Sequence, residues 1–472
     1  MMNKNKAIKA FNNIGVLMIL VLLNTPYSAA SNSNLSLHWD WMISTESVQS
    51  RNSPFIPPQP DSRQTIDGLL EVEVGYKQWL GLISLKATDL YSETQGGTSS
   101  SLLNTYQNTS PYSESNNDPS AEFIIRELYW QGGFSLANEA LGEQYIDVTL
   151  GKIRLDWGVG YGYRPLDIIK PYRRNPVGIV AEEGAGVVAL SVFDATGEWT
   201  LLYTDSSWTS QSLNDLERQS QQQGIGVRHY GMQGEQEYQW LAYYDDVRHG
   251  LIGGSMVSVL DLAWEFHGSA TYQHQSLGYE LPNSSQHPVV LGEQGNAFQT
   301  LLGLTWANEV GNSIILEYWY DSRAWTSSQW QEAIDTTTSL NKIATPSTSS
   351  TQTGTSQNTA LSASYAQGFQ HSNIVQHNVM LHWSLNSTAW AQWDWSRKIN
   401  WIQHVTPTFD LLYSPQDNGI IATQWLNYEW IDTGSASLNL ELAARFLTGQ
   451  SNSAYANLPD QHMILLNLKG RF

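Results

Sequence analysis

The sequence predicts an all-β protein, a transmembrane antiparallel up-and-down β-barrel of about 18 strands, with 16 strands as the next choice. Three observations support this fold class. Many segments alternate apolar and polar residues, no stretch after the first 30 residues approaches 18 consecutive apolar residues, and tryptophan (20) and tyrosine (23) far outnumber phenylalanine (11). A chain crosses a bilayer only as helices or as a closed barrel, and rings with a polar edge are typical of membrane interfaces. The barrel is therefore favoured over a soluble, tryptophan-rich carbohydrate-binding sandwich.

The first 30 residues predict a secretory signal peptide. Three lysines precede an apolar run at residues 14–23, and Ser28-Ala29-Ala30 offers small residues for cleavage. The run is too short for an anchor helix, because a hydrocarbon core requires about 20 residues. Cleavage after Ala30 leaves residues 31–472 as one barrel domain. It also removes three lysines, which changes the formal charge from −20 to −23.

Composition and motifs exclude several other functions. Cysteine is absent, which excludes disulfides and thiol-based metal sites. The negative charge disfavours nucleic acid as a partner. His371, His377 and His382 match no zinc signature, and no serine–histidine spacing indicates a nucleophile. We therefore expect no enzyme activity, no cofactor and no metal.

Amphipathic strands recur along the chain. In one of them, Ala436, Leu438, Leu440, Leu442, Ala444 and Phe446 alternate with Ser437, Asn439, Glu441, Ala443 and Arg445. The same period is found at residues 237–245, 313–321, 391–396 and 462–472. Such strands predict a barrel whose apolar face meets lipid and whose polar face lines the interior.

The connections between these strands have two lengths, which predicts short periplasmic turns and long extracellular loops. Short turns are expected at residues 195–197, 234–235, 386–388 and 432–434, and long loops at 91–120, 206–223, 276–296, 323–372 and 449–460. With both termini in the periplasm, the number of strands is even. A turn is expected between Val257 and His267 without a clear signal, and Asn400 to Asn418 is assigned to an extracellular loop.

The most informative internal segment begins at Gly151, where a strand enters a long loop. Lys152, Arg154 and Asp156 share the face expected to line the lumen. The apolar residues before Gly151 have the opposite phase, which predicts a β-bulge near this glycine. Several glycines and prolines then prevent a regular ladder until about residue 184.

Basic charge is concentrated in this segment, which holds six of the 21 Lys and Arg residues of the mature chain within 23 residues. We expect loop 157–183 to fold inward and to narrow the lumen, where opposed charges would filter solutes. The expected constriction residues are Lys152, Arg154, Asp156, Arg164, Asp167, Lys170, Arg173, Arg174, Glu182 and Glu183. An equally weighted alternative is a surface loop whose arginines bind lipopolysaccharide phosphates or neighbouring acids.

The carboxyl terminus resembles that of Gram-negative outer-membrane β-barrels. Ile464, Leu466, Leu468 and the terminal Phe472 share one face of the last strand. In that family such a pattern implies a signal for the barrel assembly machinery. Gly470 departs from it, because an aromatic or large apolar residue is commoner there. Together with the signal peptide, the alternation and the loop lengths, this end makes the chain similar to the porin-like channel class.

This resemblance implies a bacterial outer-membrane location and a channel for passive diffusion of small hydrophilic solutes or ions. The implied partners are outer-membrane lipids, lipopolysaccharide, the assembly machinery and the solutes, and a homo-oligomer is left open. The alternative is a barrel that exports or anchors polysaccharide, or that displays its loops as an adhesin. A receptor with a plug domain is excluded because strand-like patterning already starts at Leu37.

Overall fold

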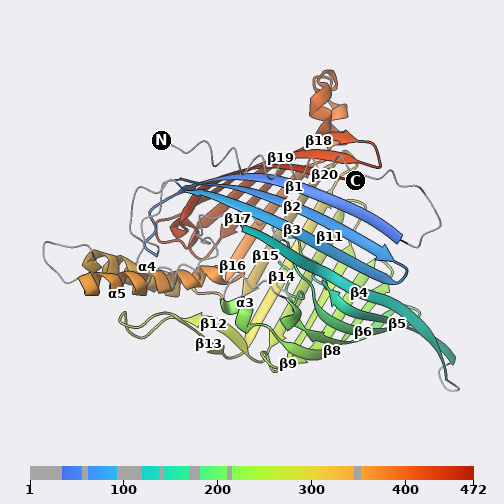
Figure 1. The fold of residues 1–472 in the computed structure, drawn as a ribbon, viewed down its shortest axis with the longest axis horizontal. Coiled ribbons are helices and arrows are strands. Elements are labelled where there is room, and N and C mark those ends of the chain that lie inside the picture. Colours follow the sequence, from blue (N-terminus) through green and yellow to red (C-terminus); the bar gives the residue numbers. More distant parts are fainter. Residues whose placement is uncertain are drawn as a thin grey trace.

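The computed structural model describes residues 35–55, 62–92, 120–138, 142–169, 181–209, 215–344 and 352–472. Within these ranges an 18-stranded antiparallel sheet closes on itself, because its first and last strands pair with each other (Figure 1). Its strands are β1 (Leu35–Ser50), β2 (Ser62–Tyr76), β3 (Trp79–Ser92), β4 (Ser120–Asn138), β5 (Gly142–Ile153), β6 (Ala185–Phe193), β7 (Gly197–Asp205), β8 (Gln223–Gln233), β9 (Gln236–Asp245), β10 (Leu251–Val259), β11 (Trp264–Gln273), β14 (Ala297–Ala307), β15 (Asn312–Asp321), β16 (His377–Leu385), β17 (Val405–Ser414), β18 (Gly419–Asp432), β19 (Ser437–Thr448) and β20 (Asp460–Arg471). The predicted all-β barrel of 18 strands is confirmed.

The two faces of the sheet follow the period of two in the sequence. Leu442 of β19 lies between Leu426 of β18 and Leu466 of β20, and all three side chains are exposed on the outer face. On the inner face the Asn467 amide donates a hydrogen bond of 3.0 Å to the Glu441 carboxylate. The outer face is therefore apolar and the inner face carries hydrogen-bonding groups, as a membrane barrel requires.

The two ends of the barrel differ, as the connection lengths predict. The short-turn end carries both chain termini of the barrel and most of the short turns, including residues 194–196, 234–235, 260–263, 308–311 and 433–436. The turn at 260–263 lies in the stretch where the sequence gives no clear signal. The long-loop end carries α3 (Asp215–Gln219), α4 (Ser327–Ala344), α5 (Gln352–Ser364), a hairpin of β12 (Ser276–Glu280) and β13 (Val290–Gln294), and the short 3₁₀ helices η1 (Ser206–Trp208), η2 (Tyr365–Gln370) and η6 (Tyr455–Asn457). Among the described helices, none is both long and apolar enough to cross a membrane.

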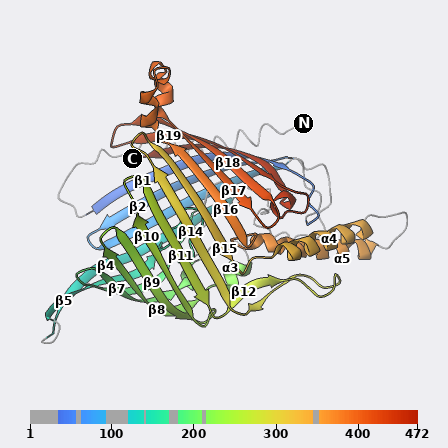
Figure 2. The ribbon, with the colours of Figure 1, turned by 180° about the vertical axis from the view of Figure 1, so that it is seen from behind.

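An apolar cluster joins the loops at the long-loop end. Helices α4 and α5 form a hairpin that extends away from the barrel at this end (Figures 1 and 2). The base of the hairpin is buried, since the Trp330 ring stacks on Phe369 at 4.7 Å and Phe55 meets Phe369 edge-on at 5.1 Å. We call the buried apolar residues around these rings the mouth cluster: Val48, Phe55, Tyr279, Val289, Trp325, Trp330, Phe369, Val375, Leu447, Tyr455, Leu458 and Met463.

Three predictions for residues 386–418 are wrong. The alternating segment 391–396 is not a strand, because residues 386–404 contain the 3₁₀ helices η3 (Ser387–Gln392), η4 (Ser396–Lys398) and η5 (Asn400–His404). The predicted short turn at 386–388 is therefore the start of a longer connection at the short-turn end. The predicted extracellular loop at 400–418 contains β17, whose connection to β18 is only residues 415–418. The sequence pattern failed because the alternating tryptophans pack on one another in a connection of 3₁₀ helices instead of sharing one face of a strand.

The predicted β-bulge at Gly151 is also wrong, although the strand changes phase there. The ladders of β5 with both neighbours pass through Gly151 without a shift of register. The glycine instead adopts a φ of +136°, a conformation that residues with a Cβ rarely adopt. Leu150 is exposed, whereas Lys152 pairs with an acid inside the barrel. The register shift lies on β4, where Arg126 is the extra residue opposite β3.

A charged residue placed on the outer face tests which face of β19 meets lipid. Leu442→Arg is expected to lower the free energy of unfolding by about 2–4 kcal/mol, because the charge would lie against lipid near the middle of β19. Asn439→Arg, on the inner face of the same strand, is expected to have a much smaller effect. Urea unfolding in lipid vesicles, followed by heat-modifiable gel migration, measures both variants. Equal losses would contradict this assignment.

Candidate functional site

The chain between β5 and β6 enters the barrel and reaches its opposite wall. We call its described part, residues 154–169 and 181–184, the inward segment. The backbone N–H groups of Tyr161 and Gly162 each donate a hydrogen bond of 2.6 Å to the carboxylate of Glu317 on β15. The same carboxylate lies 2.9 Å from His267 Nε2, and Glu317 is 0% exposed. One buried acid on the far wall thus fixes the tip of the segment.

Further contacts tie the inward segment to β8, β9 and β15. The Gln239 amide donates to the carbonyl of Trp157, and the Arg228 guanidinium lies over the Trp157 ring at 5.3 Å. The Tyr163 hydroxyl donates to Asp321 at 3.0 Å. Ile168 is buried among residues of the inner wall that include Leu251. Both polar and apolar contacts therefore hold the segment across the lumen.

Two glycines permit this close approach. A Cβ at Gly160 would overlap the carbonyl of Tyr163 and the side chain of Leu301, and a Cβ at Gly162 would crowd Met380 and Glu317. The glycine run of the sequence is thus needed for tight packing at these two positions.

The structure brings the described charges of the predicted constriction together in three groups. Lys152 Nζ lies 2.7 Å from Glu183, whose side chain is buried, and the Lys152 side chain is only 11% exposed. Arg154 lies 2.9 Å from Asp156 and 3.0 Å from Glu182, and Arg154 and Asp156 are both 39% exposed. Arg164 lies 3.9 Å from Asp167, whose carboxylate accepts the N–H groups of Trp157 (2.8 Å) and Gly158 (2.7 Å). Lys170, Arg173 and Arg174 lie outside the described residues.

The sequence analysis missed charged residues that other strands supply to this site. Arg126 pairs with Glu71 of β2 and donates a hydrogen bond of 2.8 Å to the carbonyl of Glu182. A signal was present, because the outward apolar residues change from odd positions (Ile125) to even positions (Leu128) around Arg126. The acids Glu317 and Asp321 carry no such signal. An acidic residue on the inner face has the same sequence pattern whether it faces open water or binds a segment inside the lumen.

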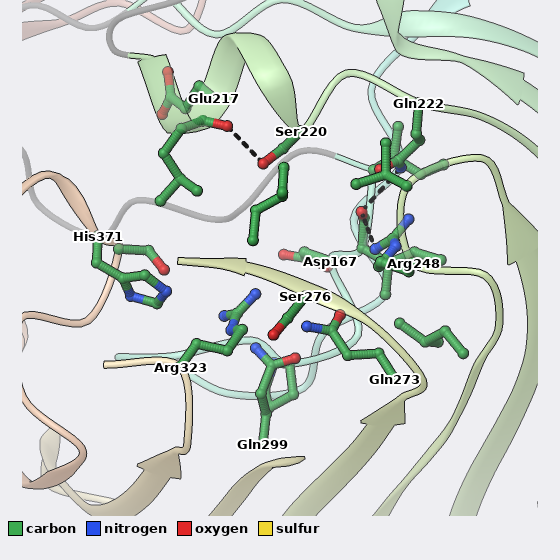
Figure 3. A pocket seen from close by; sticks show the side chains of 18 of the residues that line it. Asp167, Glu217, Ser220, Gln222, Arg248, Gln273, Ser276, Gln299, Arg323 and His371 are labelled. Atoms are coloured by element: carbon green, nitrogen blue, oxygen red, sulfur yellow. Dashed lines mark hydrogen bonds between the residues drawn. The ribbon is translucent and has the colours of Figure 1, made fainter. Parts of the chain in front are cut away.

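A cavity of about 140 Å³ lies beside the tip of the inward segment at the long-loop end (Figure 3). Figure 3 shows Glu217 and Ser220 on one side and Gln273, Gln299 and Arg323 on the other. Its lining carries both signs of charge: Arg164, Arg248 and Arg323 with Asp167 and Glu217, together with His371.

Acidic residues hold Arg248 and Arg323 of the cavity in place. Arg248 also has an N–H group without a hydrogen-bond partner among the described residues. Arg323 lies 2.7 Å from Asp321. Arg248 lies 2.7 Å from Asp245 and donates to the carbonyl of Ile168 at 2.8 Å. Its Nη2 is buried and has no hydrogen-bond partner among the described residues. Burial lowers the pKa of His371 to about 4, so its imidazole is neutral near pH 7.

Among the described residues, no group of three or more His, Asp or Glu side chains could hold a metal ion. The closed sheet, its apolar outer face and the charged segment inside it together define the class of the protein: it has the fold of a porin-like outer-membrane β-barrel.

One comparison with a solved structure supports this fold. OccAB1 of Acinetobacter baumannii is similar in structure, with a TM-score of 0.53, 9% sequence identity, and coverage of 95% of this chain and 99% of that one. A BenF-like porin from Pseudomonas fluorescens Pf-5 (TM-score 0.47, 8% identity, 93% and 98% covered) and OprD of Pseudomonas aeruginosa (0.41, 6%, 94% and 99%) have lower TM-scores. No protein-family model and no curated protein matches the sequence. At 9% identity, the likeness to OccAB1 shows the fold alone.

The anchor of the inward segment can be tested by removing its acceptor. Each hydrogen bond to a charged group contributes about 1.5–3 kcal/mol, so Glu317→Ala is expected to speed amide exchange at residues 158–164 roughly tenfold or more. Hydrogen–deuterium exchange of the protein in lipid nanodiscs measures the effect. The control is Glu429→Ala, an exposed glutamate on the inner face of β18. Unchanged exchange in Glu317→Ala would show that the tip is held by other contacts.

Proposed function

We propose that the protein is a channel for passive diffusion of small hydrophilic solutes or ions across the bacterial outer membrane. In this orientation the short-turn end faces the periplasm and the long-loop end faces outward. The observation that supports the proposal best is the inward segment: a charged stretch of chain crosses a closed barrel and is fixed to the far wall by Glu317. The proposal requires no catalytic step and no cofactor.

The burial of the charges separates two roles within the segment. The Lys152–Glu183 pair is largely buried, and it therefore holds the segment against the wall without meeting a solute. Arg154 and Asp156 are both partly exposed, and Arg164 is partly exposed as well. Exposed charges of both signs at a narrow point set a field across the lumen that acts on the charge and dipole of a passing solute. We therefore assign selectivity to the partly exposed group.

Solutes would reach the segment from outside through the polar cavity beside it. The mouth cluster covers part of the long-loop end with buried apolar side chains, which offer no path to water. The cavity lined by Arg164, Arg248 and Arg323 lies directly beside the segment. Its arginines and amides could hold the polar groups of a solute before it passes the narrow point.

The remaining sequence predictions complete the proposal. Residues 1–30 lie outside the described residues, and we propose that they are cleaved as a signal peptide. In β20, Ile464 and Leu466 are exposed on the outer face, and Phe472 packs on Trp39 at 5.1 Å between ring centroids. We propose that this strand, including Leu468, is the signal read by the barrel assembly machinery, and that lipopolysaccharide surrounds the long-loop end.

Removing basic charge from the predicted constriction loop, residues 157–183, should change ion selectivity. Neutralising Arg164, Lys170, Arg173 and Arg174 together is expected to shift the cation-to-anion permeability ratio at least about twofold toward cations, because four positive charges are removed from the proposed constriction. Planar-bilayer recordings with a salt gradient measure the ratio.

The matched control neutralises four basic residues outside the segment, Arg218, Lys342, Arg397 and Lys398, and is expected to leave the ratio unchanged. Unchanged selectivity and conductance in the first variant would remove the segment from the pore. A barrel that exports polysaccharide or displays its loops with a plugged lumen would carry little current in either variant.

Selectivity should also depend on pH through Asp167, because its buried carboxylate lies 3.9 Å from the partly exposed Arg164 and contributes to the field there. Burial raises the pKa of this carboxyl to about 6, against the opposing effects of the Gly158 and Trp157 N–H groups and of Arg164. Since a raised pKa favours the neutral acid, Asp167 gains a proton as the pH falls from 7 to 5. The channel is then expected to become less cation-selective over this range. Asp167→Asn, recorded in the same way, is expected to lack this pH dependence, and identical pH profiles would show that the charge of Asp167 does not act on the passing ions.

A further inference from the structure

One connection at the short-turn end is unlike the others described there. Residues 386–404, which we call the tryptophan knob, join β16 to β17 through η3, η4 and η5. The knob projects from the barrel beside the ends of β18 and β19 and stands clear of the other elements in both views (Figures 1 and 2). The neighbouring turns at 308–311 and 433–436 are short. A short turn is enough to connect two strands of a barrel wall. The extra length of the knob therefore has another role.

The knob presents a fixed set of indole rings to its surroundings. Trp390 is held by a hydrogen bond of 2.7 Å from its Nε1 to the carbonyl of Val405, and the Trp393 ring meets it at 5.6 Å. Trp393 and Trp395 are stacked with an angle of 18° between their planes. Trp395 is 54% exposed and Trp401 is 60% exposed. Rings of this size in such positions are unusual for a surface that meets only water.

Short polar contacts fix the knob to itself and to the barrel. The Ser396 hydroxyl donates to the carbonyl of Trp393 at 2.9 Å, and the Gln392 amide donates to the carbonyl of Val310 at 3.0 Å. Because Val310 lies in the β14–β15 turn, the barrel sets the direction in which the rings point. The exposed rings are therefore a built feature and not the side chains of a loose loop.

The charge of the knob is opposite to that of the whole chain. Arg397 and Lys398 are exposed at its tip, and their only acidic neighbour in the knob is Asp394, which lies 3.5 Å from Arg397. Such an exposed pair contributes little binding energy, so both cations stay available to an external anion. The full chain carries a formal charge of −20. Basic residues beside tryptophans are typical of segments that lie at the surface of a membrane.

The knob is also continuous with the lipid-facing surface of the barrel. His404 at its end meets the Tyr428 ring edge-on at 6.2 Å. Tyr428 pairs with Leu440 on the outer face of the sheet, where the exposed Leu426 and Ile431 of β18 also lie. The aromatic surface therefore runs from the lipid-facing row of β18 directly onto the knob. This continuity favours a lipid surface over a soluble partner.

We propose that the tryptophan knob is a membrane anchor that lies in the headgroup region of the periplasmic leaflet beside the barrel. Trp393, Trp395 and Trp401 insert at the boundary between headgroups and acyl chains, where indole rings are favoured. Arg397 and Lys398 bind the phosphates of anionic phospholipids. This inference depends on the proposed orientation of the barrel but not on whether the barrel conducts solutes.

The absence of cysteine from the sequence allows a direct test. Asn400→Cys is labelled with a fluorophore in the full-length mature protein, in vesicles of phosphatidylethanolamine and phosphatidylglycerol. Quenching is compared for lipids that carry a nitroxide at the headgroup and for iodide in the water. Ser435→Cys, on the short β18–β19 turn, is the matched control, and Gln403→Cys is a second site on the knob. Heat-modifiable migration confirms that each variant is folded.

The knob labels are expected to be quenched roughly threefold more strongly than the Ser435 label by headgroup nitroxides, and less strongly by iodide. Replacing all three exposed tryptophans by serine should abolish this difference. Arg397→Gln with Lys398→Gln should abolish its dependence on phosphatidylglycerol. Equal quenching at positions 400 and 435, or protection from iodide only when soluble peptidoglycan fragments or a periplasmic extract are added, would overturn the proposal. Channel recordings of the same variants test the proposed function separately.

Discussion

The need to pair every backbone polar group inside a lipid layer determines this structure. A strand that faces hydrocarbon has no water to satisfy its N–H and C=O groups, so an open edge is excluded and the sheet must close. The closure is the ladder between β1 and β20, which runs from the pair Asp40 and Arg471 to the pair Ser50 and Asp460. Once the sheet is closed, alternate side chains must point to lipid and to the interior. The amphipathic pattern of the sequence is the consequence.

The same rule acts on the interior, where buried charges need partners. Glu317 is fully buried on β15, and an ionised carboxylate in such a place is costly unless hydrogen bonds satisfy it. The backbone of the inward segment supplies two of these bonds and His267 lies within reach of a third. The wall and the segment therefore depend on each other. A barrel wall with this acid requires something inside the lumen, and the segment requires this acid to cross it.

The sequence predicted those features that depend on local pattern, and it missed those that depend on distant partners. Period-two alternation and turn residues are local, so the closed 18-stranded barrel and most connections could be predicted. Segment 391–396 misled the same reasoning because its rings satisfy the alternation while packing on each other. In β17, Pro407 lies opposite Leu426 within a regular ladder, although a proline cannot donate a ladder hydrogen bond. The concentration of charge after Gly151 was visible, but the groups that bind the backbone of this segment, Arg126, Glu127 and Glu317, come from β4 and β15, and no spacing in the sequence shows those contacts.

Aromatic residues are buried at the long-loop end of the barrel and exposed at the short-turn end. At the long-loop end, Trp330 and Phe55 are removed from solvent within the mouth cluster, which ties loops from distant parts of the chain into one body. At the short-turn end, Trp395 and Trp401 stay exposed although the segment that carries them is well fixed. Burial of the first set stabilises the loops around the opening, because apolar area leaves water when they pack together. Trp395 and Trp401 bury no comparable apolar area against other residues of the chain. The favourable environment for these rings must therefore come from outside the protein, and the lipid surface that already covers β18 is the nearest one.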